Sequence, residues 1–189
     1  MLLKKLWNFI WHDDSILSWI VNIILALVLV KFIIYPGLGF IFSTTHPLVA
    51  VVSGSMEHNN QNLDKWWSTQ GSWYEQQNIR KEVFSEFPFK NGFSRGDIMI
   101  LIGTKNLKGG DVIVFVRDGG SRIPVIHRIV ETQETDPMVY VTKGDNNNDR
   151  DPWKVDAVLG KAVLRIPYLG YVKILFVDYI LNPLRKTFL

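Results

Sequence analysis

The longest apolar run of the chain lies near its N-terminus, from Ile16 to Ile34. The only clearly polar residues within this run are Ser18, Asn22 and Lys31. Nineteen residues in a helix span roughly 28 Å, which is close to the hydrocarbon thickness of a bilayer. We therefore predict a transmembrane helix over residues 15–35, which is ended by the helix breakers Pro36, Gly37 and Gly39.

A cleavable signal peptide is the main alternative for this run. The run is longer than the usual core of such a peptide, and no clear small-x-small cleavage site follows it. Lys4 and Lys5 precede the run, which favours a cytoplasmic N-terminus over residues 1–14. We expect everything after residue 35 to be extracytoplasmic, so that the protein crosses the membrane once.

After this run the periodicity changes from helical to strand-like. Short segments rich in Val and Ile are separated by Gly, Asp and Asn turn signals; they cover residues 48–52, 97–102, 111–116, 123–130 and 138–142. Residues 118–121, Asp-Gly-Gly-Ser, indicate a hairpin turn. The pattern predicts a mainly β fold, with an antiparallel β-domain over residues 36–167.

Residues 58–93 differ from this pattern and are predicted to form an insertion that contains a helix. One helical face would carry Leu63, Trp66, Trp67, Gln70, Trp73, Tyr74 and Gln77. The aromatic residues either pack on the β-domain or form a cap that rests on the bilayer or lines the substrate path. The sequence leaves both interpretations open.

The C-terminal region, residues 168–189, is predicted to form a membrane-proximal helix and a tail. Its apolar stretch from Val172 to Leu181 is too short to span a bilayer as a helix, and Pro183 interrupts it. A docked or interfacial helix is the better interpretation.

Composition excludes several kinds of site. The chain has no cysteine, so disulfides, thiolate metal sites and cysteine nucleophiles are excluded. The net charge of +3 is too small and too evenly spread to indicate nucleic-acid binding. No cofactor fingerprint is present, and we expect neither a cofactor nor a metal.

Ser55 and His127 are the candidate nucleophile and base. Ser53-Gly54-Ser55 follows a predicted strand, and glycine at a strand end permits a tight turn that exposes a hydroxyl. A serine nucleophile needs a proton acceptor, and His127 lies in the middle of a strand that would hold its ring rigidly. A histidine among apolar residues is more often a packed core residue, so each signal is weak by itself.

The polar segment from Lys143 to Pro152 supplies the candidate acids. A solvated loop is the simplest interpretation of this segment. A calcium loop is disfavoured, because Arg150 stands where such a loop requires glycine. One aspartate of the segment would alternatively orient His127 and stabilise its protonated form.

Taken together and in this order, the motifs resemble the type I signal peptidases, in their archaeal and endoplasmic-reticulum branch. Val51 to Glu57 is similar to the nucleophile box of that family, and residues 94–98 and 110–115 resemble its two Gly-Asp boxes. Residues 126–130 resemble the base box, with His127 where bacterial members have lysine. Residues 143–151 resemble the final box.

The resemblance implies a membrane-bound serine endopeptidase that removes signal peptides from secretory precursors and cuts after a small residue. It implies a Ser55–His127–Asp arrangement without a cofactor, in which Asp151 is the first choice for the acid and Asp145 the second. The backbone N–H of Ser55 and, by resemblance, the Ser53 hydroxyl would stabilise the oxyanion.

An exposed strand edge would bind the substrate as an added strand, and residues 48–52 are one candidate for this edge. Val51, Val52 and Met56 are the predicted substrate contacts. Signal-peptide-bearing precursors, membrane lipids, and other signal peptidase subunits or the translocon are the expected partners. The alternatives are a non-catalytic membrane-anchored scaffold and a specialised peptidase for surface or pilin-like proteins.

Overall fold

The computed structural model describes residues 2–117 and 124–176, so the predicted turn at 118–121 and the chain after Phe176 lie outside the described residues. The chain divides into two compact units, residues 1–41 and 42–189. Each unit is described by itself.

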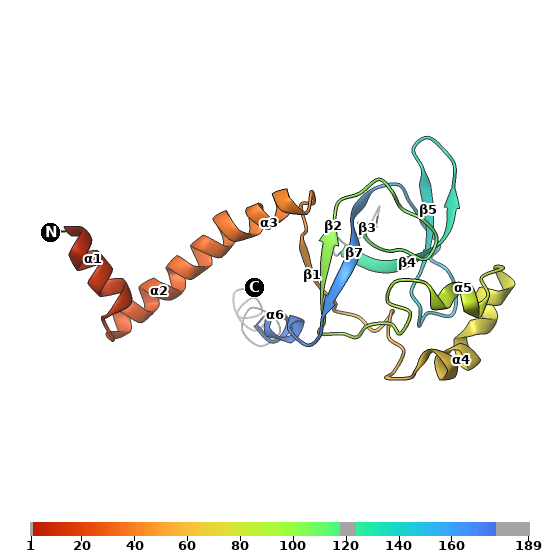
Figure 1. Cartoon of the computed structure of the whole chain (residues 1–189), viewed down its shortest axis with the longest axis horizontal. Coiled ribbons are helices and arrows are strands. Elements are labelled where there is room, and N and C mark those ends of the chain that lie inside the picture. Colours follow the sequence, from red (N-terminus) through yellow and green to blue (C-terminus); the bar gives the residue numbers. More distant parts are fainter. Residues whose placement is uncertain (1, 118–123, 177–189) are drawn as a thin grey trace, which may run out of the picture. The chain divides into compact units, whose positions relative to one another are not determined.

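The N-terminal unit is helical. Helices α1 (Leu2–Trp11), α2 (Ile16–Leu29) and α3 (Tyr35–Ile41) follow one another (Figure 1). A π-helical turn, η1 (Val30–Ile34), joins α2 to α3. Residues 16–41 form one continuous apolar helix that is long enough to cross a membrane. Two of its polar side chains bond carbonyls of α1: Ser18 Oγ donates to Phe9 O at 2.6 Å, and Asn22 Nδ2 donates to Ile10 O at 2.9 Å.

The prediction that the helix ends at Pro36 was wrong. Pro36 is the second residue of α3, directly after the π-helical turn, in which Tyr35 N–H bonds Val30 O. Proline is tolerated in the first turn of a helical segment, and the wider π turn before it accommodates the ring. The helix therefore continues to Ile41.

The second unit is built on one antiparallel sheet of seven strands, which confirms the predicted mainly β fold. The strands are β1 (Leu48–Ala50), β2 (Ile98–Ile102), β3 (Val112–Val116), β4 (Pro124–Gln133), β5 (Val139–Lys143), β6 (Lys154–Val155) and β7 (Val158–Ile166). Their order in the sheet is β1-β2-β7-β3-β4-β5-β6, and the sheet curls on itself (Figure 1).

Strand β3 lies between two hydrophobic clusters. Val112 and Val114 belong to the larger one, together with residues of β2, β4 and β7, whereas Ile113 and Phe115 face a second cluster that includes Ile129. Burial on both faces explains why this strand is apolar throughout instead of alternating.

The two Gly-Asp motifs form the same structure twice. Gly96 and Gly110 both have φ of +92°, and each following aspartate accepts the backbone N–H of the residue three positions before it, at 2.8 Å for Asp97 and 3.1 Å for Asp111. Both carboxylates then pair with a basic side chain of β7: Asp97 with Arg165 at 2.7 Å and Asp111 with Lys161 at 2.8 Å. These aspartates therefore close turns onto strand β7, which lies between β2 and β3.

The insertion contains helices α4 (Leu63–Gln76) and α5 (Lys81–Ser85), which confirms the predicted helix. The Asn62 side chain caps α4 by accepting the N–H of Lys65. Four aromatic side chains of the insertion are buried in one cluster: Trp66, Trp67, Tyr74 and Phe84. These four pack inside the domain, so they do not form a membrane cap. Near the C-terminus, helix α6 is described over Gly170–Phe176.

We expect Gly110→Ala to destabilise the domain strongly. A Cβ at this position would lie 2.3 Å from the ring of Phe87, and the positive φ disfavours any side chain. Thermal unfolding in detergent should show that the free energy of unfolding falls by at least about 2 kcal/mol. Gly109→Ala is the matched control, because nothing lies within 4 Å of its Cβ position; equal effects of the two variants would contradict this account.

Candidate active site

The turn that carries Ser55 is separated from the end of strand β1 by two residues. We call residues 53–57 the Ser55 turn, which is closed by a hydrogen bond from Glu57 N to Gly54 O at 3.1 Å. Ser55 is partly exposed, and its Oγ lies 3.2 Å from the Oγ of Ser53. Met56, the next residue, is completely buried in the hydrophobic core and fixes the turn to the domain. The Ser55 hydroxyl is thus held near the surface by a buried neighbour.

His127 lies on β4, opposite Ile113 of β3, and is largely buried. Its Nδ1 is 2.6 Å from Asp151 Oδ2. Thr142 Oγ1 donates to the same carboxylate oxygen at 2.6 Å, and Asp151 N donates to Thr142 O at 2.8 Å. Asp151 is therefore fixed by β5 and in turn fixes the imidazole through Nδ1, which leaves Nε2 for other chemistry.

Gly144 brings the Ser55 turn and His127 together. A Cβ at Gly144 would lie 2.8 Å from Ser55 O and 2.9 Å from His127 Nε2, so both groups approach the same point. Both residues also line one pocket of about 330 Å³. The lining residues are Val49, Ala50, Val52, Ser53, Ser55, Pro124, Val125, Ile126, His127, Asn147 and Trp153. The pocket thus joins the end of β1 to the first half of β4.

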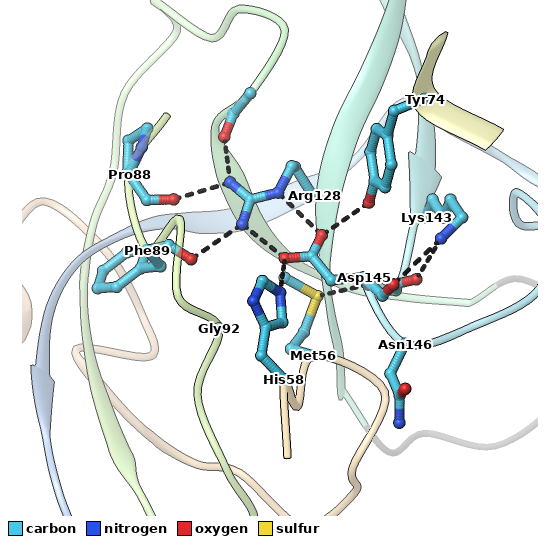
Figure 2. A network of polar contacts seen from close by, with 12 residues as sticks. Met56, His58, Tyr74, Pro88, Phe89, Gly92, Arg128, Lys143, Asp145 and Asn146 are labelled. Carbon is cyan, nitrogen blue, oxygen red and sulfur yellow. Dashed lines mark hydrogen bonds and ion pairs between the residues drawn. The ribbon is translucent and has the colours of Figure 1, made fainter. Parts of the chain in front are cut away.

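Asp145 is the centre of a separate buried network (Figure 2). Arg128 binds its carboxylate with two groups, Nε to Oδ1 at 2.9 Å and Nη2 to Oδ2 at 2.7 Å. The Tyr74 hydroxyl donates to Oδ1 at 2.9 Å, and His58 Nε2 lies 3.1 Å from Oδ2. The structure therefore pairs Asp151, and not Asp145, with His127.

The charges of this network hold Asp145 ionised. Burial opposes ionisation, but the positive charge of Arg128 and the hydrogen bonds from His58 and Arg128 keep the pKa of Asp145 well below its usual value. Burial and the neighbouring carboxylate raise the pKa of Tyr74 well above its usual value, so its phenol stays protonated and donates. Asp145 is thus a fixed anion whose oxygens are occupied by donors.

The segment from Gly144 to Asp151, which we call the 144–151 loop, also holds the backbone of the Ser55 turn. Asn146 N donates to Ser55 O at 2.8 Å, and Asn146 Nδ2 donates to Gly54 O at 3.2 Å. Asp145 N lies 3.4 Å from Met56 Sδ. The candidate nucleophile and the candidate base are therefore both attached to one short loop.

Two predicted substrate contacts lie elsewhere. Val51 and Met56 are 1% and 0% exposed and belong to the core, so their side chains do not line the pocket. Their apolar character serves packing, whereas Val52 points outward and lines the pocket. The sequence did not predict the burial of Val51 and Met56, because the alternation of buried and exposed side chains along a strand does not continue into the turn.

Sequence reasoning missed Arg128, Thr142 and Tyr74 as site residues. Arg128 adjoins His127 in the sequence, but arginine is seldom buried, so no pattern indicated a buried ion pair. Tyr74 lay within a predicted aromatic face, and its hydrogen bond to Asp145 depends on tertiary structure alone. In residues 2–117 and 124–176, no group of three or more His, Asp or Glu side chains could hold a metal ion.

Lys143 is a buried cation beside the loop. Its Nζ donates to the carbonyls of Gly144 and Asp145 at 3.1 and 3.3 Å, and it lies over the rings of Trp73 and Tyr74. Burial lowers the pKa of Lys143 to about 8, although nearby carboxylates, those of Asp145, Asp149 and Asp151, oppose this shift.

The lowered pKa predicts a stability difference between pH 8 and pH 10. In this range the unfolded chain binds a proton at Lys143 that the folded chain has lost, so the free energy of unfolding should rise with pH by up to about 1.4 kcal/mol per unit. Denaturant titration in detergent should show this rise in the wild type and its loss in Lys143→Met. Lys105→Met, at an exposed lysine, is the control. Parallel curves for wild type and Lys143→Met would contradict the assignment.

Comparison with known proteins gives the family. The chain is 28% identical over 159 residues to the signal peptidase complex catalytic subunit SEC11C of Homo sapiens, covering 77% of this chain and 65% of the human protein. It is 30% identical over 160 residues to the SEC11 subunit of Scheffersomyces stipitis, covering 78% of this chain and 75% of that protein. The SEC11 subunit of Pyricularia oryzae is 28% identical, with 82% and 77% covered.

No family model matches the chain. The chain spans 65% of the length of its mammalian relatives, and the fungal SEC11 protein with 30% identity is covered over three quarters of its length. Together with the motif order and the fold, this similarity shows that the chain belongs to the type I signal peptidase family, in the branch that includes the SEC11 catalytic subunits.

Proposed function

We propose that this protein is a membrane-bound serine endopeptidase that removes signal peptides from secretory precursors, cutting after a small residue. The observation that carries the proposal is that Ser55 and His127 line one pocket and that the Ser55 carbonyl and His127 Nε2 both lie beside Gly144, with Asp151 2.6 Å from the imidazole. The relatives' names, which describe catalytic subunits of a signal peptidase complex, support it.

In the proposed reaction, Ser55 Oγ attacks the scissile carbonyl while His127 Nε2 takes its proton. Asp151 keeps the imidazole oriented through Nδ1 and stabilises its protonated form. The protonated ring then gives the proton to the leaving amine as the peptide bond breaks. Water, activated by the same ring, hydrolyses the acyl-enzyme and frees Ser55.

The backbone N–H of Ser55 is the first candidate to stabilise the oxyanion, because it belongs to the residue that attacks. The Ser53 hydroxyl is the second. Its position 3.2 Å from Ser55 Oγ at the pocket rim supports this role.

The substrate would bind as an extended strand. In the register of the described strands, β1 pairs only with β2, and residues 124–127 of β4 pair only with β3. Both segments line the pocket that contains Ser55 and His127, so an extended peptide between them would find free backbone groups on either side. Val49, Val52 and Ile126 line this pocket, and their apolar side chains are consistent with the proposed preference for a small substrate residue.

The membrane arrangement is part of the proposal. The helix over residues 16–41 would cross the bilayer once, with residues 1–14 cytoplasmic and the β-domain extracytoplasmic. Residues 168–176 would lie near the membrane, which the exposed side chains of Tyr168, Leu169 and Val172 support. Precursor proteins and lipids are the proposed partners, and other signal peptidase subunits or the translocon are further ones.

Replacement of the candidate nucleophile is the decisive test. Detergent-solubilised wild type should cleave a model secretory precursor after a small residue, whereas Ser55→Ala should lower the rate by at least about 10³-fold because no nucleophile remains. Ser72→Ala, at an exposed serine of α4, is the matched control and should retain full activity. Equal cleavage by wild type and Ser55→Ala would exclude this mechanism. If neither protein cleaves, even in reconstituted membranes, a membrane-anchored scaffold is the better interpretation.

The choice between the two acids has its own test. Asp151→Asn should lower kcat by about 10²- to 10⁴-fold with the fold intact, because the amide no longer stabilises the protonated imidazole. Asp156→Asn, at an exposed acid a few residues later, should stay within about twofold of wild type. Precursor cleavage and circular dichroism would be measured together; a folded Asp151→Asn with wild-type kcat would rule Asp151 out.

A further inference from the structure

Helix α4 of the insertion contacts the 144–151 loop through two adjacent aromatic side chains. The Tyr74 hydroxyl donates to Asp145 Oδ1 at 2.9 Å, and Trp73 Nε1 donates to Asp149 Oδ1 at 3.0 Å. The ammonium of Lys143, just before the loop, lies 5.1 and 4.9 Å from the ring centroids of Trp73 and Tyr74. Two adjacent aromatic residues of one helix thus hold three positions of the loop region.

The same loop also holds the Ser55 turn and His127. Asn146 donates to the carbonyls of Ser55 and Gly54, and Asp151 binds His127. There is no free space at Gly144, where a Cβ would come within 2.9 Å of the imidazole. A displacement of the loop would therefore move the Ser55 backbone and the His127 partner together.

Tyr74 is placed to act on this loop rather than merely to fill space. Its side chain is completely buried within the aromatic cluster of the insertion, in contact with Trp66, Trp67 and Phe84. Its hydroxyl leaves that cluster to reach Asp145, as Figure 2 shows. The phenol is thus fixed at one end by packing and bound to the loop at the other.

We propose that Tyr74, supported by Trp73, is a positioning residue through which the 58–93 insertion holds the 144–151 loop in place. The insertion acts through Asp145 and Asp149 on the loop, and through Asn146 on the Ser55 turn. The expected effect on the cleavage rate rests on the proposed peptidase function, whereas the expected effect on the 144–151 loop and the Ser55 turn does not.

The test compares Tyr74→Phe, which removes only the hydroxyl, with Tyr140→Phe, which removes the hydroxyl of a largely buried tyrosine on β5. Full-length proteins in detergent micelles are used. In Tyr74→Phe, the rate of hydrogen–deuterium exchange should rise within residues 53–57 and 144–151 and stay unchanged in the strands of the sheet. Precursor cleavage should show kcat lowered about 10-fold with KM within about twofold, because the geometry and not substrate binding is disturbed. Tyr140→Phe should change neither measurement.

The outcomes separate the two claims. Unchanged exchange in the two segments, or faster exchange spread evenly over the sheet, overturns the inference. Local exchange changes with wild-type kcat overturn the positioning role and leave Tyr74 a structural residue. If wild type does not cleave, the proposed function fails, while the exchange data still decide whether Tyr74 holds the Ser55 turn. Should Tyr74→Phe not fold, Trp73→Phe, which removes the partly exposed donor to Asp149, takes its place with the same criteria.

Discussion

The buried ion pair between Arg128 and Asp145 is the interaction on which the rest of the site depends. Both side chains are completely buried, and the remaining Arg128 donors reach the carbonyls of Pro88, Phe89 and Gly110. A buried pair contributes little net stability, because desolvation of the two charges offsets their attraction, but loss of one partner is costly. Its effect here is to join β4, the 144–151 loop, the end of the insertion and a Gly-Asp turn at one point.

This pair also explains how two aspartates in one loop have different environments. The Asp145 carboxylate is occupied by a guanidinium, a phenol and an imidazole, so it has no free oxygen to offer His127. Asp151, six residues later, meets a single hydroxyl and the imidazole Nδ1. The first carboxylate holds the loop in place, and the second binds the imidazole of His127 on β4.

Several of these features could be predicted from the sequence, because they depend on local patterns. Strand-forming runs and their turns gave the antiparallel sheet, and the motif order gave the family. The continuation of the helix through Pro36 could not be predicted, because it depends on a π-helical turn that propensities do not encode. Nor could the burial of Met56 or the bonds of His58 and Tyr74 to Asp145, since these depend on contacts between residues more than 70 positions apart.

The insertion shows how such distant contacts affect a site that local motifs define. Without α4, Asp145 Oδ1 would keep the bond from Arg128 Nε, but water would have to replace the Tyr74 hydroxyl, and the Lys143 ammonium would lose the aromatic faces that cover it. Water can satisfy both groups, but it does not fix their positions, because it is not attached to the protein framework. A hydroxyl held by a packed aromatic cluster does fix them. The insertion therefore restrains the loop through α4, while Ser55 and His127 of the proposed site line a pocket of their own.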